Sequence, residues 1–66
     1  MIKLVDGCSY TTTNSDLFID VLAIYHEDTQ TIKARVRLRN KHNGIVYEEK
    51  NRKLYKKLIS HWKRVG

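Results

Sequence analysis

The stretch that decides the predicted fold is Thr31-Ile32-Lys33-Ala34-Arg35-Val36-Arg37-Leu38-Arg39. Its apolar and basic residues alternate without a break. Because successive side chains of a β-strand point to opposite faces, this alternation predicts a half-buried strand over residues 31–40. One face of the strand would be apolar. The other would carry four cations in a row, which we call the basic stripe: Lys33, Arg35, Arg37 and Arg39.

The segments that flank this strand predict two hairpins, and so a three-stranded meander. Residues 17–26 form the longest apolar segment, and a loop at 27–30 would return the chain antiparallel into the basic strand. Asn43-Gly44 predicts a second turn, followed by a strand over 44–49 with Ile45 and Tyr47 on the core face. The first hairpin then pairs apolar residues with each other: Ile19 with Leu38, Val21 with Val36, and Ala23 with Ala34.

The same register makes predictions for the basic face. Asp20 falls opposite Arg37, and in the second hairpin Glu48 falls beside Arg39 or Arg37. A slip of one residue would move every side chain to the wrong face, so the agreement between the two strands supports this register. Tyr25 is assigned to the apolar face of its strand.

Both ends of the chain predict further elements. Asp6-Gly7 suits a tight turn that would join residues 1–5 to residues 8–12 as a hairpin. From Asn51, a residue type that suits the N-cap, apolar residues recur at helical spacing, which predicts a helix over about 52–64. Its apolar side would contain Leu54, Tyr55, Leu58, Ile59, Trp62 and Val65.

The size and composition of the chain limit the classes of function that it can have. The 66 residues predict a single domain with a thin core, because a chain this short buries only about 60% of its unfolded surface. No apolar run has the length of a membrane span, and the N-terminus lacks a signal-peptide pattern, so we expect a cytoplasmic protein with no membrane contact. The single cysteine, Cys8, cannot form an internal disulfide, which agrees with that location.

Charge is distributed unevenly along the chain, which has a net charge of +6. Residues 1–31 hold one cation and five carboxylates, whereas residues 32–66 hold twelve cations and two carboxylates. Such asymmetry favours a polyanionic partner or an acidic protein surface. A solvated basic surface that keeps a small protein soluble is the alternative interpretation.

Taken together, a hairpin, a three-stranded meander and a C-terminal helix predict a mainly β fold. In order and size this arrangement resembles the small five-stranded antiparallel SH3-like barrels, such as the small archaeal chromatin proteins. That resemblance is one of architecture, without a shared motif. It implies that the meander would face nucleic acid. Residues 58–65, Leu-Ile-Ser-His-Trp-Lys-Arg-Val, also resemble the endings of short proteins of tailed phages.

The candidate nucleic-acid-binding residues follow from the basic strand and its surroundings. Arginine predominates in the basic stripe, and its planar fork suits phosphate, whereas lysine or glutamate would serve solubility equally well. Phe18 is the aromatic residue on the same face, so it is the candidate for stacking on a base; coverage by the helix is the alternative. The full set is Lys33, Arg35, Arg37, Arg39, Lys41, Phe18, Lys53 and Lys57.

Catalytic, metal and cofactor sites are not predicted. The three histidines, His26, His42 and His61, lie in separate elements without metal-ligand spacing, and the chain has no glycine-rich phosphate loop. The leading hypothesis is therefore a non-enzymatic protein that binds the backbone of DNA or RNA. A phage-encoded module that modulates a host enzyme through the same basic face, in the host cytoplasm, is the alternative. A homodimeric structural protein is a third possibility.

Overall fold

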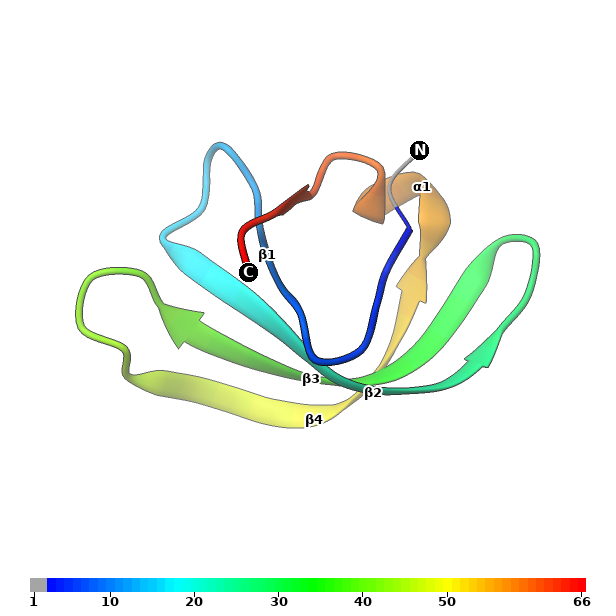
Figure 1. The fold of residues 1–66 in the computed structure, drawn as a ribbon, viewed down its shortest axis with the longest axis horizontal. Helices are drawn as coiled ribbons and strands as arrows, with labels where there is room; N and C mark the ends of the chain where they lie inside the picture. Colours follow the sequence, from blue (N-terminus) through cyan, green and yellow to red (C-terminus); the bar gives the residue numbers. More distant parts are fainter. Residues whose placement is uncertain (1–2) are drawn as a thin grey trace.

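The computed structural model describes residues 3–66, which form a five-stranded antiparallel sheet with one short helix. In chain order the elements are β1 (Ser9–Thr11), β2 (Leu17–Glu27), β3 (Thr31–Asn40), β4 (Val46–Tyr55), α1 (Lys56–Ile59) and β5 (Lys63–Arg64). The strand order in the sheet is β4-β3-β2-β1-β5 (Figure 1). The predicted mainly β fold and its central meander are confirmed. The sheet is not closed, so a barrel is not confirmed.

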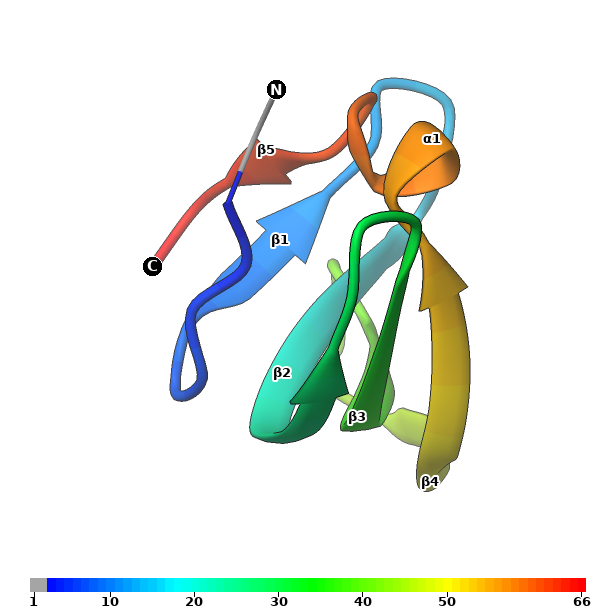
Figure 2. The ribbon, with the colours of Figure 1, turned by 90° about the vertical axis from the view of Figure 1, so that its right-hand side faces the viewer.

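The three long strands form a curved layer whose concave side is covered by the rest of the chain. Residues 3–8, β1, β5 and α1 lie over that side, as Figures 1 and 2 show. Tyr10 of β1 is fully buried there, and its ring centre lies 6.2 Å from that of Trp62. The buried hydrophobic core consists of Leu4, Cys8, Tyr10, Val21, Ile32, Ala34, Val36 and Ile59.

The β2–β3 hairpin keeps the predicted register in its first half and departs from it in the second. Val21 lies opposite Val36, as predicted, but a bulge follows Val21, so that Ala23 lies opposite Arg35 instead of Ala34. Ile24 takes the place opposite Ala34 and packs against the core. A second bulge lies between Ile24 and His26. The prediction that Tyr25 faces the core is therefore wrong, and its side chain is 61% exposed.

The predicted helix over 52–64 is wrong in its extent. β4 continues as a strand to Tyr55 and pairs with β3 from Val46↔Arg39 to Tyr55↔Thr31, so only one helical turn remains. This pairing satisfies the backbone groups along one edge of β3 over its whole length, which outweighs a helical pattern that is marginal in so short a segment. No helix in the described part of the chain is long and apolar enough to cross a membrane.

β4 also departs from the predicted core. Ile45 is 57% exposed and Tyr47 is 61% exposed, so neither joins the core face as predicted. The cause is a register shift between Leu38 and Arg39, which places Glu48 opposite Leu38 and Val46 opposite Arg39. β4 is also the edge strand of the sheet, so within residues 3–66 no strand lies beyond it on that side.

The predicted N-terminal hairpin is replaced by a different pairing. Residues 1–2 lie outside the described residues, and residues 3–5 are not a strand. The predicted turn is present, since Gly7 has a φ of +80° and its N–H donates to the carbonyl of Val21 at 2.7 Å. β1 instead pairs with β2 on one side and with β5 on the other. The C-terminal segment therefore occupies the edge expected for residues 1–5.

Candidate nucleic-acid interface

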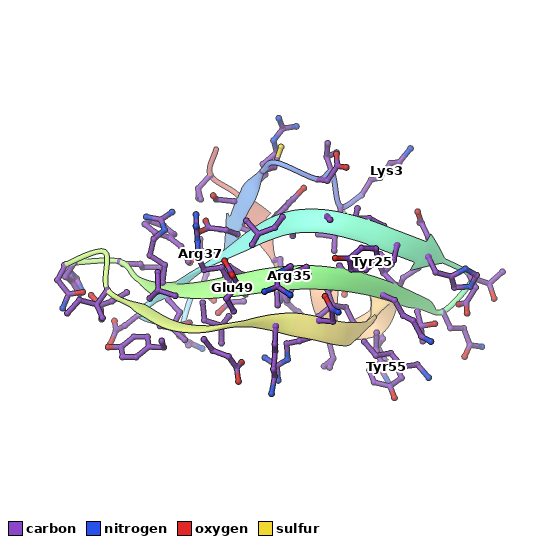
Figure 3. The ribbon with its side chains drawn as sticks, turned by 90° about the horizontal axis from the view of Figure 1, so that it is seen from below. Lys3, Tyr25, Arg35, Arg37, Glu49 and Tyr55 are labelled. Atoms are coloured by element: carbon purple, nitrogen blue, oxygen red, sulfur yellow. The ribbon has the colours of Figure 1, made fainter. Side chains whose placement is uncertain are left out.

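The basic stripe lies on the convex side of the long strands, opposite the covered core. We call this surface the open face; Figure 3 looks onto it. The alternation of β3 is as predicted, because Ile32, Ala34 and Val36 are at most 2% exposed on the other side. The three arginine side chains are between 31% and 41% exposed. β3 thus presents its cations to solvent on a rigid central strand.

A buried carboxylate holds one end of the basic stripe. The side chain of Asp20 in β2 is only 7% exposed, and its Oδ2 accepts hydrogen bonds from Nε of Arg37 and Nε of Arg39, both at 3.0 Å. Its Oδ1 accepts from Nη2 of Arg39 at 3.0 Å and from the hydroxyl of Ser9 at 2.6 Å. The hydrogen bond from Arg39 is the main reason that the pKa of Asp20 lies well below its usual value; those from Ser9 and Arg37 add to it, and burial opposes it.

Arg35, in the middle of the basic stripe, is paired with a carboxylate of the outer strand. Its Nη2 donates to Oε2 of Glu49 at 3.1 Å, and both side chains are 41% exposed. The predicted position of Glu48 beside Arg39 or Arg37 is wrong. Glu48 lies opposite Leu38, away from the open face, and contacts two cations of its own strand. The register shift near Arg39 exchanges the roles of the two glutamates.

Lys33 occupies the other end of the basic stripe, where the charges are not neutralised. It lies opposite Lys53 of β4 on one side and His26 of β2 on the other. Neither lysine forms an ion pair within residues 3–66. Like charges directly opposite each other on neighbouring strands are destabilising. This end of the open face is therefore the part best suited to receive an anion.

A shallow hollow of about 280 Å³ lies at this end of the sheet. It is lined by Tyr25, Lys33, Asn51, Arg52 and Lys53. The exposed ring of Tyr25 borders it, near the position labelled in Figure 3. The hollow combines cationic, amide and aromatic groups, which is the chemistry that binds a phosphate together with an adjacent base or sugar.

Phe18 lies on the open face, as predicted, at the opposite end of the basic stripe. The guanidinium of Arg39 lies over its ring, 4.8 Å from the centre, and Nζ of Lys41 lies 5.8 Å from the same centre. Lys41 also donates to the carbonyl of Thr12 at 3.4 Å. A cation therefore already covers the ring of Phe18, which leaves it less accessible to a base than a free aromatic ring would be.

The two remaining candidates separate in space. Lys53, predicted on the helix, lies on β4 and joins the open face opposite Lys33. Lys57 lies in α1, where it helps to line a different hollow of about 540 Å³ with Thr29, Gln30 and Leu58. The structure thus brings Lys53 into the site and leaves Lys57 outside it.

Sequence reasoning missed three contributors to this surface. Glu49 was overlooked in favour of its neighbour, and Tyr25 was assigned to the core because a bulge leaves no mark in the alternation of residues. The role of Asp20 was predicted only in part: its place opposite Arg37 was predicted, but its contact with Arg39 was not.

Among residues 3–66, no group of three or more histidine, cysteine, aspartate or glutamate residues is placed to hold a metal ion. Comparisons of the chain with protein-family models, with curated proteins and with solved structures found no match, so the interpretation of the site depends on its own geometry.

Proposed function

We propose that this protein is a non-enzymatic, cytoplasmic nucleic-acid-binding protein that contacts the phosphate backbone through the open face of its sheet. The observation that carries the proposal is the pair Lys33 and Lys53, which lie opposite each other on neighbouring strands without an ion-pair partner in residues 3–66. A bound phosphate between them would turn a repulsive pair into an attractive arrangement.

The arginines support the same role in a different way. Within the described residues Arg37 donates only through Nε, to Asp20, so its two terminal nitrogens remain available to a ligand. Asp20 therefore fixes the direction of the Arg37 guanidinium through Nε and leaves the two terminal nitrogens, which are the part that suits a phosphate, free of hydrogen bonds to residues 3–66. Arg35 is tied to Glu49 through one terminal nitrogen and keeps the others. Such contacts position a nucleic acid without reading its sequence.

An acidic protein surface is the second candidate partner, as expected for a phage-encoded modulator of a host enzyme. The observation that favours it is the combination of half-exposed arginines with Tyr25 and Tyr55, which are 61% and 50% exposed. Arginine and tyrosine are the residue types that dominate binding energy in protein interfaces. On this alternative the same open face would bind a folded acidic partner.

A salt titration tests the primary proposal. Labelled duplex DNA, single-stranded DNA and RNA are titrated with the wild type and with the double variants Lys33→Ala/Lys53→Ala and Arg35→Ala/Arg37→Ala. If these four residues each neutralise one phosphate, the logarithm of the duplex binding constant falls against log salt with a slope of about −3.6. Removing either pair should flatten the slope by about 2 and weaken all sequences alike.

The matched control is Lys57→Ala/Lys63→Ala, which removes the same charge from exposed positions outside the open face. It should leave the slope close to that of the wild type. Undetectable binding at low salt, or equal slopes for the control and for both open-face variants, would overturn the proposal. Retention of a protein partner after nuclease treatment, with loss on Arg35→Ala/Arg37→Ala, would favour the acidic-surface alternative.

A further inference from the structure

β4 is a long outer strand with one free edge. It is ten residues long, and among residues 3–66 its only neighbouring strand is β3. Figure 2 shows the free edge on the side away from β3. The N–H of Lys56 donates to the carbonyl of Gln30 at 2.8 Å, across the same hairpin. Because hydrogen-bonded and non-bonded positions alternate along an antiparallel pair, Glu49, Asn51, Lys53 and Tyr55 direct their backbone groups to the free edge.

An edge of this kind is a template for another strand. Proteins commonly protect such edges with charge, and residues 48–53 of β4, Glu-Glu-Lys-Asn-Arg-Lys, are charged at every position but one. These charges are arranged so that the strand is complementary to an antiparallel copy of itself. The order of signs along the run, mostly negative before Asn51 and positive after it, reverses in the copy.

Symmetry restricts the register of such a pair. Two antiparallel edges are related by a two-fold axis perpendicular to the sheet, which keeps both open faces on the same side and places one residue opposite its own copy. Any charged residue on the axis would meet an identical charge. Asn51 is the only uncharged residue in the run, and its amide can both donate to and accept from the same amide in the copy.

We propose that two copies of this chain form a dimer through antiparallel pairing of their β4 edges, with Asn51 on the two-fold axis. On the open face this register places Glu49 opposite the partner's Lys53, twice in each dimer. Glu49 contacts Arg35 through Oε2 alone, so its second oxygen is available to that lysine. Tyr55, which lies beside the free edge in Figure 3, comes level with the partner's Tyr47, and both tyrosines are at least half exposed in the single chain.

The opposite face of the strand carries the less favourable part of the contact. There Lys50 lies opposite the partner's Arg52. Glu48 moderates this repulsion, because within each chain it already contacts Lys50 at 3.0 Å and Arg52 at 3.6 Å. The dimer joins two sheets into one continuous sheet and places both basic stripes on one side. The pairing does not depend on nucleic-acid binding; in the dimer Lys53 gains an ion-pair partner, and Lys33 opposite it remains, within residues 3–66, the unpaired cation at that end of the open face.

Sedimentation velocity over a range of concentrations tests the dimer, with circular dichroism as a check that each variant is folded. We expect the wild type to shift from monomer to dimer as concentration rises. Glu49→Lys and Lys53→Glu each place like charges opposite each other at two positions, so each should weaken the dimer by more than roughly tenfold. The double variant Glu49→Lys/Lys53→Glu restores opposite charges and should recover the dimer.

Cysteine cross-linking tests the register independently. Asn51→Cys puts two thiols face to face on the axis, within the Cα separation that a disulfide spans, so oxidation should give a covalent dimer. In the matched variant Lys50→Cys the two thiols are offset by two residues along the strand, beyond the roughly 7 Å limit for a disulfide. The buried thiol of Cys8 is present in both and serves as the internal control.

Each outcome of the two experiments either supports the dimer or overturns it. A wild type that stays monomeric at all concentrations, a double charge variant that stays monomeric when both single variants do, or equal cross-linking of Asn51→Cys and Lys50→Cys would overturn the proposal. Recovery of the dimer in the double variant, with cross-linking only at residue 51, would establish both the edge and its register.

Discussion

Asp20 and Arg39 form a two-point ion pair across β2 and β3, with Nε to Oδ2 and Nη2 to Oδ1 both at 3.0 Å. The same carboxylate also holds Arg37, so one buried charge orders two of the four cations in the basic stripe. The other end, at Lys33, has no such partner in residues 3–66. The basic stripe is therefore divided into a structural end and an end free to bind an anion.

Asp20 should contribute substantially to stability. Replacing it with alanine leaves Arg37 and Arg39 without their shared acceptor and should lower the free energy of unfolding by roughly 3 kcal/mol, the low end for a buried ion pair, because both arginines remain partly exposed. Asp16→Ala is the control: its side chain is 84% exposed, and within residues 3–66 its only ion-pair contact is with His42, at 3.8 Å. Chemical denaturation measures the free energy of unfolding of both variants. Equal losses of stability in the two would show that Asp20 does not hold the basic stripe in place.

The stability of the fold should decline in acid because of Asp20. Since its pKa in the folded protein lies below that of the unfolded chain, the stabilisation is complete above the unfolded value and is lost as pH falls toward the folded one. Asp28 acts in the same direction, because hydrogen bonds from the N–H groups of Gln30 and Thr31 lower its pKa to about 2. Thermal melts below pH 5 should show a falling midpoint for the wild type and a shallower fall for Asp20→Asn. Parallel curves for the two proteins would contradict this account.

Hydrogen exchange distinguishes the observed strand β4 from the helix that the sequence predicts. In the monomer, the amides of residues 50, 52 and 54 face β3 and should exchange slowly, whereas those of 49, 51 and 53 face solvent and should exchange fast. The measurement is made at low concentration, where self-pairing of β4 would not protect the free edge. Uniform protection over residues 52–64 would indicate a helix instead.

The central meander was predictable because two independent signals agree there. The alternation of residues 31–40 sets the faces of β3, and the apolar match of Val21 with Val36 sets the register of the hairpin. The same signals also predicted that Asp20 lies opposite Arg37, which is half of the ion-pair cluster. Wherever alternation is regular and one face is buried, the sequence contains enough information to place the side chains.

The remaining features depend on tertiary contacts that no local pattern records. Residues 48–53 in the middle of β4 are all polar, so they show neither an alternating nor a helical apolar pattern, and the pairing with β3 decides their structure. The bulge after Val21 moves Tyr25 to the open face, and nothing in the alternation marks it. β5 has only two residues and pairs with β1 from the far end of the chain, beyond the range of any local signal.

The two faces of β3 should respond very differently to substitution. Val36 is 1% exposed, so Val36→Asp places a carboxylate without a partner in a thin core and should unfold the domain. Arg35→Ala removes only a half-exposed ion pair and should cost less than about 1 kcal/mol. Thermal melts compare the two variants. Similar losses of stability would mean that the assignment of faces along β3 is wrong.

The last prediction links stability to function at the free end of the stripe. Lys33→Glu replaces a repulsive pair with a carboxylate opposite Lys53 and beside His26, so the free energy of unfolding should rise by about 0.2–1 kcal/mol. The same change removes one proposed phosphate contact and introduces a repulsive charge, so duplex affinity should fall.

Lys57→Glu is the matched control, because it makes the same change of net charge in α1, outside the open face. We expect a stabilised protein with weakened binding for Lys33→Glu and near wild-type binding for Lys57→Glu, measured by denaturation and by titration at low salt. A destabilised Lys33→Glu would show that the two lysines do not repel each other, and an unchanged affinity would show that this end of the sheet does not contact the nucleic acid.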